Sequence, residues 1–200
     1  NPLIKPIYYS DVVSEFQMDK IRDKIIFEIH EIDYLFKEGK HGLHPLSFTE
    51  ESGRLIGIMG ASGAGKSTLL NVLNGSTPPS SGDILINGIN IFTEKEKAEG
   101  IIGHVSQDDL LIEDLTVYQN LYYNAKLCFD NYSEEEIVET VNRTLENLGL
   151  FEIKDIQVGS PLNKKISGGQ RKRLNIALEL IREPAVLFLD EPTSGLSSRD

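Results

Sequence analysis

The sequence is poor in the residues that cross-link chains or bind transition metals. Among its 200 residues, Cys128 is the only cysteine, which excludes an internal disulfide and a thiolate metal cluster. The four histidines, at positions 30, 41, 44 and 104, do not have the spacing of metal ligands. We therefore expect Cys128 and the histidines to be structural or exposed residues.

Long hydrophobic runs are also absent. A membrane-spanning helix needs about 18 to 20 consecutive apolar residues, whereas the longest apolar runs here cover residues 55–61 and 185–189. The first six residues lack the basic region, apolar core and cleavage site of a secretion signal. We therefore expect a cytoplasmic chain that does not insert into the bilayer by itself.

Basic residues are in the minority, with 20 Lys and Arg against 31 Asp and Glu, which gives a formal net charge of −11. Such a surface repels a nucleic-acid backbone, so we expect no nucleic-acid partner. A function that binds phosphate must then depend on a local binding motif and not on the overall charge. The shares of hydrophobic and charged residues, 40% and 26%, are typical of a soluble globular domain with one core.

The residue pattern predicts a mainly parallel α/β sheet that carries a helical insertion. Residues 1–23 are interpreted as a leader or linker with a short helix near 11–18, and the domain proper is residues 24–200. Apolar residues alternate from 27 to 36 with a change of parity that predicts a bulge near His30 and Glu31. Residues 83–92 are typical of a hairpin. Short buried strands are predicted at 54–59, 101–105 and 185–189.

Helical periodicity from about residue 110 to 182 predicts a helical subdomain. Ser133 and Glu136 have the spacing of a capping box, an apolar stripe follows them, and Gly149 is placed to end the helix. A second helix is predicted at 167–182, before Pro184.

A glycine-rich segment joins the predicted strand at 54–59 to a helix. It matches the pattern G-x-x-x-x-G-K-[S/T] and consists of Gly60, Ala61, Ser62, Gly63, Ala64, Gly65, Lys66 and Ser67, followed by Thr68. Backbone N–H groups in such a P-loop cradle phosphate oxygens, and the helix N-terminus adds partial positive charge. Lys66 would reach the β- and γ-phosphates, and Ser67 would place its hydroxyl on Mg²⁺. The alternative is a glycine-rich turn with an incidental lysine.

Two adjacent acids follow the apolar strand at 185–189. Asp190 and Glu191 would lie at the carboxyl edge of the sheet, where α/β proteins bind ligands. Because neighbouring residues of an extended chain point to opposite sides, Asp190 could hold Mg²⁺ through water while Glu191 polarises the attacking water. The alternative is a strand that simply ends in solvated acids.

The segment from Ser167 to Gln170 opens a predicted helix, and its simplest interpretation is a helix cap with a flexible turn. Arg171, Lys172 and Arg173 place three cations in the first turn, against the helix dipole. An anion bound nearby would offset that cost. A solvated basic face remains the alternative.

Together these segments resemble the ATPase domains of ABC transporters. Ile166-Ser167-Gly168-Gly169-Gln170 resembles the signature sequence, and the P-loop, Gln107 and the Walker B strand stand in the family's order from about residue 25 onward. The resemblance implies a P-loop NTPase fold with an additional N-terminal antiparallel β-subdomain. It also implies that ATP is bound with Mg²⁺, that Gln107 binds the metal and senses a transmembrane domain, and that Lys66, Gln107 and Glu191 are catalytic.

The resemblance further implies a head-to-tail dimer with a second ATP-binding domain, identical or different. In this dimer the ATP of the partner domain would be contacted by the signature residues Ser167, Gly168, Gly169 and Gln170. The aromatic residue that stacks on adenine in the family falls on Phe36 by spacing, with Tyr34 as the other candidate, and either could equally belong to the core.

Finer details resemble the G subfamily, half-transporters whose ATPase domain precedes the membrane domain. The similar segments are residues 105–109, 115–117, 171–177 and 192–196. This implies substrate export from the cytoplasmic face of a cell membrane. Ser197 stands where the family has an aspartate, which puts the D-loop contact across the dimer in doubt. The sequence stops at Asp200, before the strand that leads to the switch histidine, so we expect a domain that is incomplete at its C-terminal end and inactive alone.

The motifs also admit three alternatives. Chromosome-maintenance ATPases insert a long coiled coil, for which the segment between Gln107 and Ser167 is too short. A soluble ABC-type translation factor that binds ribosomes would carry two such domains and a charged linker. The chain could also bind nucleotide without hydrolysing it.

Overall fold

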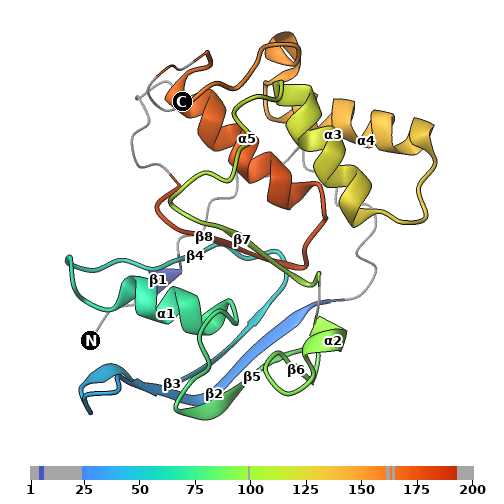
Figure 1. Cartoon of the computed structure of the whole chain (residues 1–200). Coiled ribbons are helices and arrows are strands. Elements are labelled where there is room, and N and C mark those ends of the chain that lie inside the picture. The colour runs from blue at the N-terminus through green and yellow to red at the C-terminus, as the bar shows by residue number, and fades with distance from the viewer. Residues whose placement is uncertain (1–4, 7–23, 99, 161–162, 164, 193–200) are drawn as a thin grey trace. The chain divides into compact units, whose positions relative to one another are not determined.

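The computed structural model describes residues 5–6, 24–98, 100–160, 163 and 165–192 (Figure 1). The chain divides into two compact units, Asn1–Ile102 and Gly103–Asp200. The helix predicted near residues 11–18 and the departure at Ser197 lie outside the described residues.

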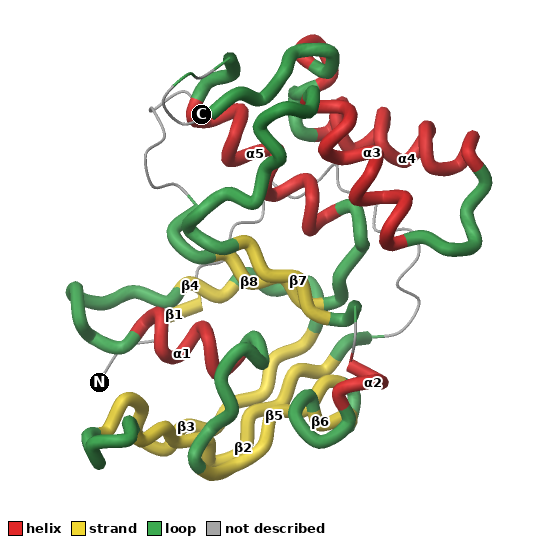
Figure 2. The backbone as a smooth tube through the Cα atoms, in the orientation of Figure 1, coloured by secondary structure: helices red, strands yellow, loops and turns green. Residues whose placement is uncertain are grey.

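The first unit is built on a four-stranded antiparallel sheet in the order β3-β2-β5-β6 (Figure 2). Its strands are β2 (Ile26–Leu35), β3 (His41–Glu51), β5 (Ser81–Ile86) and β6 (Ile89–Asn90). The predicted bulge in β2 is confirmed, because the register with β3 shifts between Ile29 and Ile32 and Glu31 has a positive φ of 48°. The extra residue lets Phe27, Ile29 and Ile32 all be buried although their parity differs.

The predicted hairpin is also confirmed. Asn87 and Gly88 join β5 to β6 with φ values of 49° and 79°, as a type I′ turn requires. The side-chain oxygen of Asn87 accepts a hydrogen bond of 2.7 Å from the N–H of Ile26, which ties the turn to the start of β2. Strand β3 is not visible in the sequence pattern, because Pro45 interrupts it and its eleven residues are all exposed or half-buried.

The strand predicted at 54–59 is much shorter than expected. Strand β4 covers only Ile56–Gly57 and pairs with β1 (Lys5–Pro6) in antiparallel fashion. The prediction of a buried strand is wrong at its ends, because Leu55 and Met59 are exposed. Among the described residues β4 pairs with β1 alone, and these two short strands offer too little surface to cover the flanking side chains. Two residues of the predicted leader thus belong to this sheet.

The helices of the first unit are α1 (Lys66–Leu73) and the short α2 (Lys95–Ala98). Helix α1 contacts β3. It buries Leu69, Leu70, Val72 and Leu73, which is the apolar side expected of a helix that packs on a core.

In the second unit β7 (Ile102–Val105) and β8 (Val186–Leu189) form a two-stranded sheet, which confirms both predicted strands. The helices are α3 (Val117–Cys128), α4 (Glu134–Asn147), the 3-10 helix η1 (Phe151–Ile153) and α5 (Gly168–Leu180). Helices α3, α4 and α5 contact one another around a shared apolar core. Its buried members are Leu111, Val117, Leu121, Ala125, Ile137, Val141, Leu145, Leu150, Val158, Ile166, Leu174, Ala177 and Ile181.

Helix α4 begins and ends as predicted. The Ser133 hydroxyl accepts from the N–H of Glu136 at 3.3 Å, and the Glu136 carboxylate accepts from the N–H of Ser133 at 2.7 Å. At the other end, the N–H groups of Gly149 and Leu150 donate to the carbonyls of Glu146 and Leu145. These paired bonds form a Schellman motif, which satisfies carbonyls that a helix end otherwise leaves without partners.

Cys128 and two of the histidines make local contacts. Cys128 is half-buried, and burial raises the pKa of its thiol, so the thiol is neutral at physiological pH. The rings of His41 and His44 stack with centroids 5.0 Å apart. In the described part of the chain, no three histidine, cysteine or acidic side chains are grouped to hold a metal ion. No helix within that part has both the length and the apolar character needed to cross a membrane.

The Ser133→Ala substitution tests the cap of α4. It removes the bond to the N–H of Glu136, and loss of such a cap costs about 1 kcal/mol, which corresponds to roughly fivefold faster hydrogen exchange in the first turn. Hydrogen exchange of the peptide over residues 134–138 measures the change. Glu139→Ala, at an exposed position in the middle of the same helix, is the control and should leave that peptide unchanged. Equal exchange in both variants would contradict the capping role.

Candidate functional site

The predicted P-loop leads into α1 through a glycine cap. Gly65 is the N-cap residue of α1 and has a φ of 88°. A Cβ atom there would lie 3.1 Å from the carbonyl oxygen of Gly42, so both the backbone conformation and the space favour glycine. Glycine also has no side chain with which to cap the helix. The first N–H groups of α1 are therefore left for a ligand.

Lys66 folds back over the P-loop. Its Nζ donates hydrogen bonds of 2.9 Å to the carbonyl oxygens of Gly60 and Ala61. An ammonium group has three donors, so these two bonds hold the charge at the loop while one N–H remains for a phosphate oxygen. Ser67 is exposed at the start of the same helix, and Thr68 after it is half-buried.

The two aromatic candidates for adenine stacking lie close to the P-loop. The rings of Tyr34 and Phe36 meet edge to face, with centroids 5.2 Å apart. Both rings crowd Gly42, where a Cβ atom would come within 2.8 Å of each, and the Gly42 carbonyl faces Gly65. Phe36 is 42% exposed and Tyr34 is half-buried, so Phe36 offers the more accessible ring. Its role in stacking stays a prediction.

The second unit brings Gln107, Asp190 and Glu191 together. The N–H of Asp190 donates to the carbonyl of Val105 at 3.0 Å, which extends the pairing of β7 and β8 to the point where the acids begin. The side-chain amide of Gln107 donates to Oε2 of Glu191 at 3.4 Å. Glu191 has a φ of 44°, a conformation that few residues other than glycine adopt. The oxygen donors predicted from three sequence positions thus lie at one end of this sheet.

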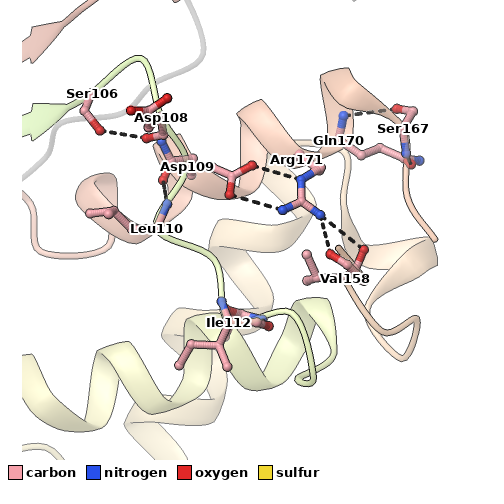
Figure 3. A network of polar contacts seen from close by, with 12 residues as sticks. Ser106, Asp108, Asp109, Leu110, Ile112, Val158, Ser167, Gln170 and Arg171 are labelled. Carbon is pink, nitrogen blue, oxygen red and sulfur yellow. Dashed lines mark hydrogen bonds and ion pairs between the residues drawn. The ribbon is translucent and has the colours of Figure 1, made fainter. Parts of the chain in front are cut away.

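The signature segment caps its own helix. Ser167 is the N-cap of α5, and its hydroxyl accepts from the N–H of Gln170 at 3.1 Å (Figure 3). The Gln170 side chain accepts from the N–H of Ser167 at 2.7 Å. This capping box satisfies the amide of Gln170 and leaves those of Gly168 and Gly169 as the first amides of the helix. The local reading as a helix cap is confirmed, and the contact with a partner's ATP stays a prediction.

The cations of the first turn do not need a bound anion to explain them. Arg171 is buried and donates to the Asp109 carboxylate (Figure 3), and Lys172 donates to the carbonyl of Ser106 at 3.2 Å. These internal acceptors account for both cations, and an anion bound near this helix start stays a prediction. Their acceptors lie in the loop that follows β7.

Sequence reasoning overlooked two buried asparagines that hold this loop. Asn175 accepts from the N–H of Leu110 at 3.2 Å, and Asn120 accepts from the N–H of Ile112 at 2.8 Å. Each stands beside a buried leucine in the apolar stripe of its helix. An amide in such a stripe is a signal that could have found them, because a buried amide needs hydrogen-bond partners.

Residues 43–194 match the ABC transporter family. The chain is 39% identical over 200 residues to ABC transporter G family member 28 of Arabidopsis thaliana, an alignment that covers 97% of the chain. It is 45% identical over 150 residues, or 73% of the chain, to ABC transporter G family member 1 of Petunia hybrida. These matches span only 18% and 23% of the two relatives.

The fold is similar to that of CbiO1 from Clostridium perfringens, described as part of the ABC transporter complex CbiONQ. The TM-score is 0.74 at 34% identity, and the match covers 88% of this chain and 68% of that one. This likeness confirms the predicted P-loop ATPase fold, and the G family relatives confirm the resemblance drawn from the motifs. Because sequence and fold agree over most of its length, the chain belongs to the ABC transporter family, in which it corresponds to the ATPase domain.

Proposed function

We propose that the domain binds MgATP on residues 60–67 and hydrolyses it with a second ATP-binding domain. Hydrolysis would drive export of a substrate through a transmembrane domain, with the ATPase at the cytoplasmic face of a cell membrane. The observation that carries the proposal is the start of α1, where Gly65 leaves the first turn without a side-chain cap and Lys66 is held over the loop.

A nucleotide triphosphate suits this site because its charge is concentrated in the phosphates. The chain repels anions over most of its surface, with a net charge of −11. The N–H groups of the P-loop and the ammonium of Lys66 overcome that repulsion locally. Phe36 follows the end of β2, its ring lies against Gly42, whose carbonyl faces Gly65, and it would stack on the base.

The residues proposed to hold Mg²⁺ have the right chemistry for it. Mg²⁺ takes oxygen ligands and keeps several waters. Ser67 offers an exposed hydroxyl, and Gln107 and Asp190 bring an amide oxygen and a carboxylate to the ends of β7 and β8. When bound, the ion would neutralise charge on the phosphates.

Glu191 is proposed as the general base. Its carboxylate accepts a hydrogen bond from Gln107 at one oxygen, so the amide orients it while the other oxygen can accept a proton from water. The unusual φ of Glu191 turns the chain directly after Asp190, which separates the two acids and lets them act differently.

The partner is proposed to be a second ATP-binding domain arranged head to tail. The start of α5, with Ser167 and Gly168 exposed and Gly169 buried, would offer its first amides to a phosphate. The division at residue 23 and the helical subdomain at about 110–182 remain our proposed domain boundaries. The G family relatives and CbiO1 support a transmembrane partner, since the latter is described as part of a transporter complex.

The Lys66→Ala substitution is expected to weaken MgATP binding by about 10- to 100-fold, because a charge-assisted contact of about 1.5 to 3 kcal/mol is lost. Isothermal titration calorimetry measures the affinity. Lys97→Ala is the matched control, because it removes an exposed cation of the same unit that contacts only Glu94 in an ion pair. If both variants bind MgATP as tightly as the parent, the P-loop assignment fails.

The Glu191→Gln substitution is expected to leave MgATP binding nearly unchanged and to lower ATP turnover by about 100-fold or more, the usual effect of losing a positioned base. Steady-state ATPase measurements on the intact protein test it. Glu183→Gln is the control, since Glu183 is also an exposed glutamate with a positive φ, of 52°, in the same unit. Undiminished turnover of the Glu191 variant would transfer the role of base to another residue.

The shared site can be tested by mixing two inactive variants, Lys66→Ala and Ser167→Asp. Aspartate keeps a helix cap at position 167 while its charge repels phosphate. In a head-to-tail dimer, one site of each mixed pair has a normal lysine and a normal serine, so mixing should restore ATPase activity above that of either variant alone. A mixture that stays as inactive as its components would show that each site is built within one chain.

A further inference from the structure

The loop that follows β7 is fastened to α5 by a set of contacts that the proposed function does not use. This loop, residues 106–112, contains Gln107, and α5 begins directly after Ser167. Both segments lie in the second unit. The contacts between them are therefore internal to one compact body.

The central contact is the ion pair of Arg171 and Asp109. Nε of Arg171 donates to Oδ2 at 2.9 Å and Nη2 donates to Oδ1 at 3.1 Å, so the pair is bidentate (Figure 3). Nη1 donates to the carbonyls of Gly159 at 2.6 Å and Val158 at 3.4 Å. The side chain of Arg171 is 6% exposed and that of Asp109 is 29% exposed. Every nitrogen of the guanidinium group thus has an acceptor, which fixes its plane.

Two further side chains of α5 hold the same loop. Nζ of Lys172 donates to the carbonyl of Ser106, and Oδ1 of Asn175 accepts from the N–H of Leu110. These contacts flank Gln107 and Asp109 on both sides. The loop cannot shift along the helix without breaking bonds at three successive points.

The cation in the first turn of α5 indicates that the contacts between this helix and the loop do more than stabilise the fold. A cation in the first turn of a helix is placed against the dipole. Arg171 bears that cost one residue after Gln170 and reaches a carboxylate two residues after Gln107. A planar fork matched to a carboxylate fixes direction as well as distance, which a lysine would not do. The bidentate contact therefore links the orientation of the loop that contains Gln107 to that of the first turn of α5.

We propose that Arg171 and Asp109 are positioning residues that make the loop at 106–110 and the first turn of α5 move as one body. The proposal rests on the proposed function. Placing Gln107 at the nucleotide of its own chain would then also place Ser167 toward the nucleotide of a second domain. Neither Arg171 nor Asp109 contacts nucleotide in this scheme, and both act through their neighbours.

The test uses the full-length transporter that contains this domain. Arg171→Lys keeps the charge but loses the fork, and Asp109→Asn keeps the shape but loses the charge. Each is expected to lower the kcat for ATP by about tenfold or more with the KM for ATP changed by less than about twofold, because the lost alignment matters only in the assembled site. The double variant should be no slower than the slower single variant, since both remove one interaction.

Asn124→Ala is the matched structural control. Nδ2 of Asn124 donates to the carbonyl of Leu178 at 2.7 Å, so this variant also removes a partly buried bond to α5 but none to the loop. It should lower the melting temperature and keep its kcat. The proposal is overturned if Arg171→Lys loses no more kcat than Asn124→Ala, or if the two single losses multiply in the double variant.

Hydrogen exchange gives a second readout that stability alone would not change. With Glu191→Gln added to retain MgATP, the peptides over 106–112 and 167–173 should gain protection together, whereas with Arg171→Lys only one of them should respond. Parallel protection in that variant would overturn the proposal. If the parent shows neither turnover nor protection of residues 60–67 by MgATP, the proposed function itself has failed, which is a separate result.

Discussion

Every helix starts with N–H groups that have no partner within the helix, and the way each helix of this chain meets that requirement decides where an anion can bind. Helices α3 and α4 begin with Thr116 and Ser133, whose capping boxes use those amides locally. Helix α1 begins with a glycine in the left-handed conformation and has no such box. The proposed phosphate site thus lies at a helix start that has no side-chain cap.

Helix α5 is an intermediate case. Its capping box fixes the start of the helix, where Gly168 is exposed and Gly169 is buried. A helix start held by a capping box suits the contact proposed with a second domain, because its amides are already oriented before the partner arrives. The ion pair of Arg171 with Asp109 also holds the first turn of this helix.

The features that could be predicted from the sequence are those that depend on residues a few positions apart. The bulge in β2, the Asn87-Gly88 turn and the cap of α4 each follow from local chemistry. The burial of Leu55 and Met59 depends on distant strands, and its prediction was wrong. Strand β3 could not be predicted, because Pro45 interrupts it and its partly buried residues do not alternate between apolar and polar. The site motifs were recognised one by one, but Arg171 and Asp109 are 62 positions apart, and no local pattern joins them.

Arg171 is more deeply buried than its partner Asp109, and this burial affects how the domain responds to ionic strength. Dissolved ions screen charges that they can approach, as at the exposed pairs of Lys24 with Glu51 and Lys97 with Glu94. They cannot surround the guanidinium of Arg171, which is enclosed by two carbonyls and a carboxylate. Added salt would therefore weaken the repulsion between the acidic side chains of the surface. It would leave the contact of Arg171 with Asp109 unchanged. Ionic strength would thus change the repulsion at the surface without changing the buried ion pair.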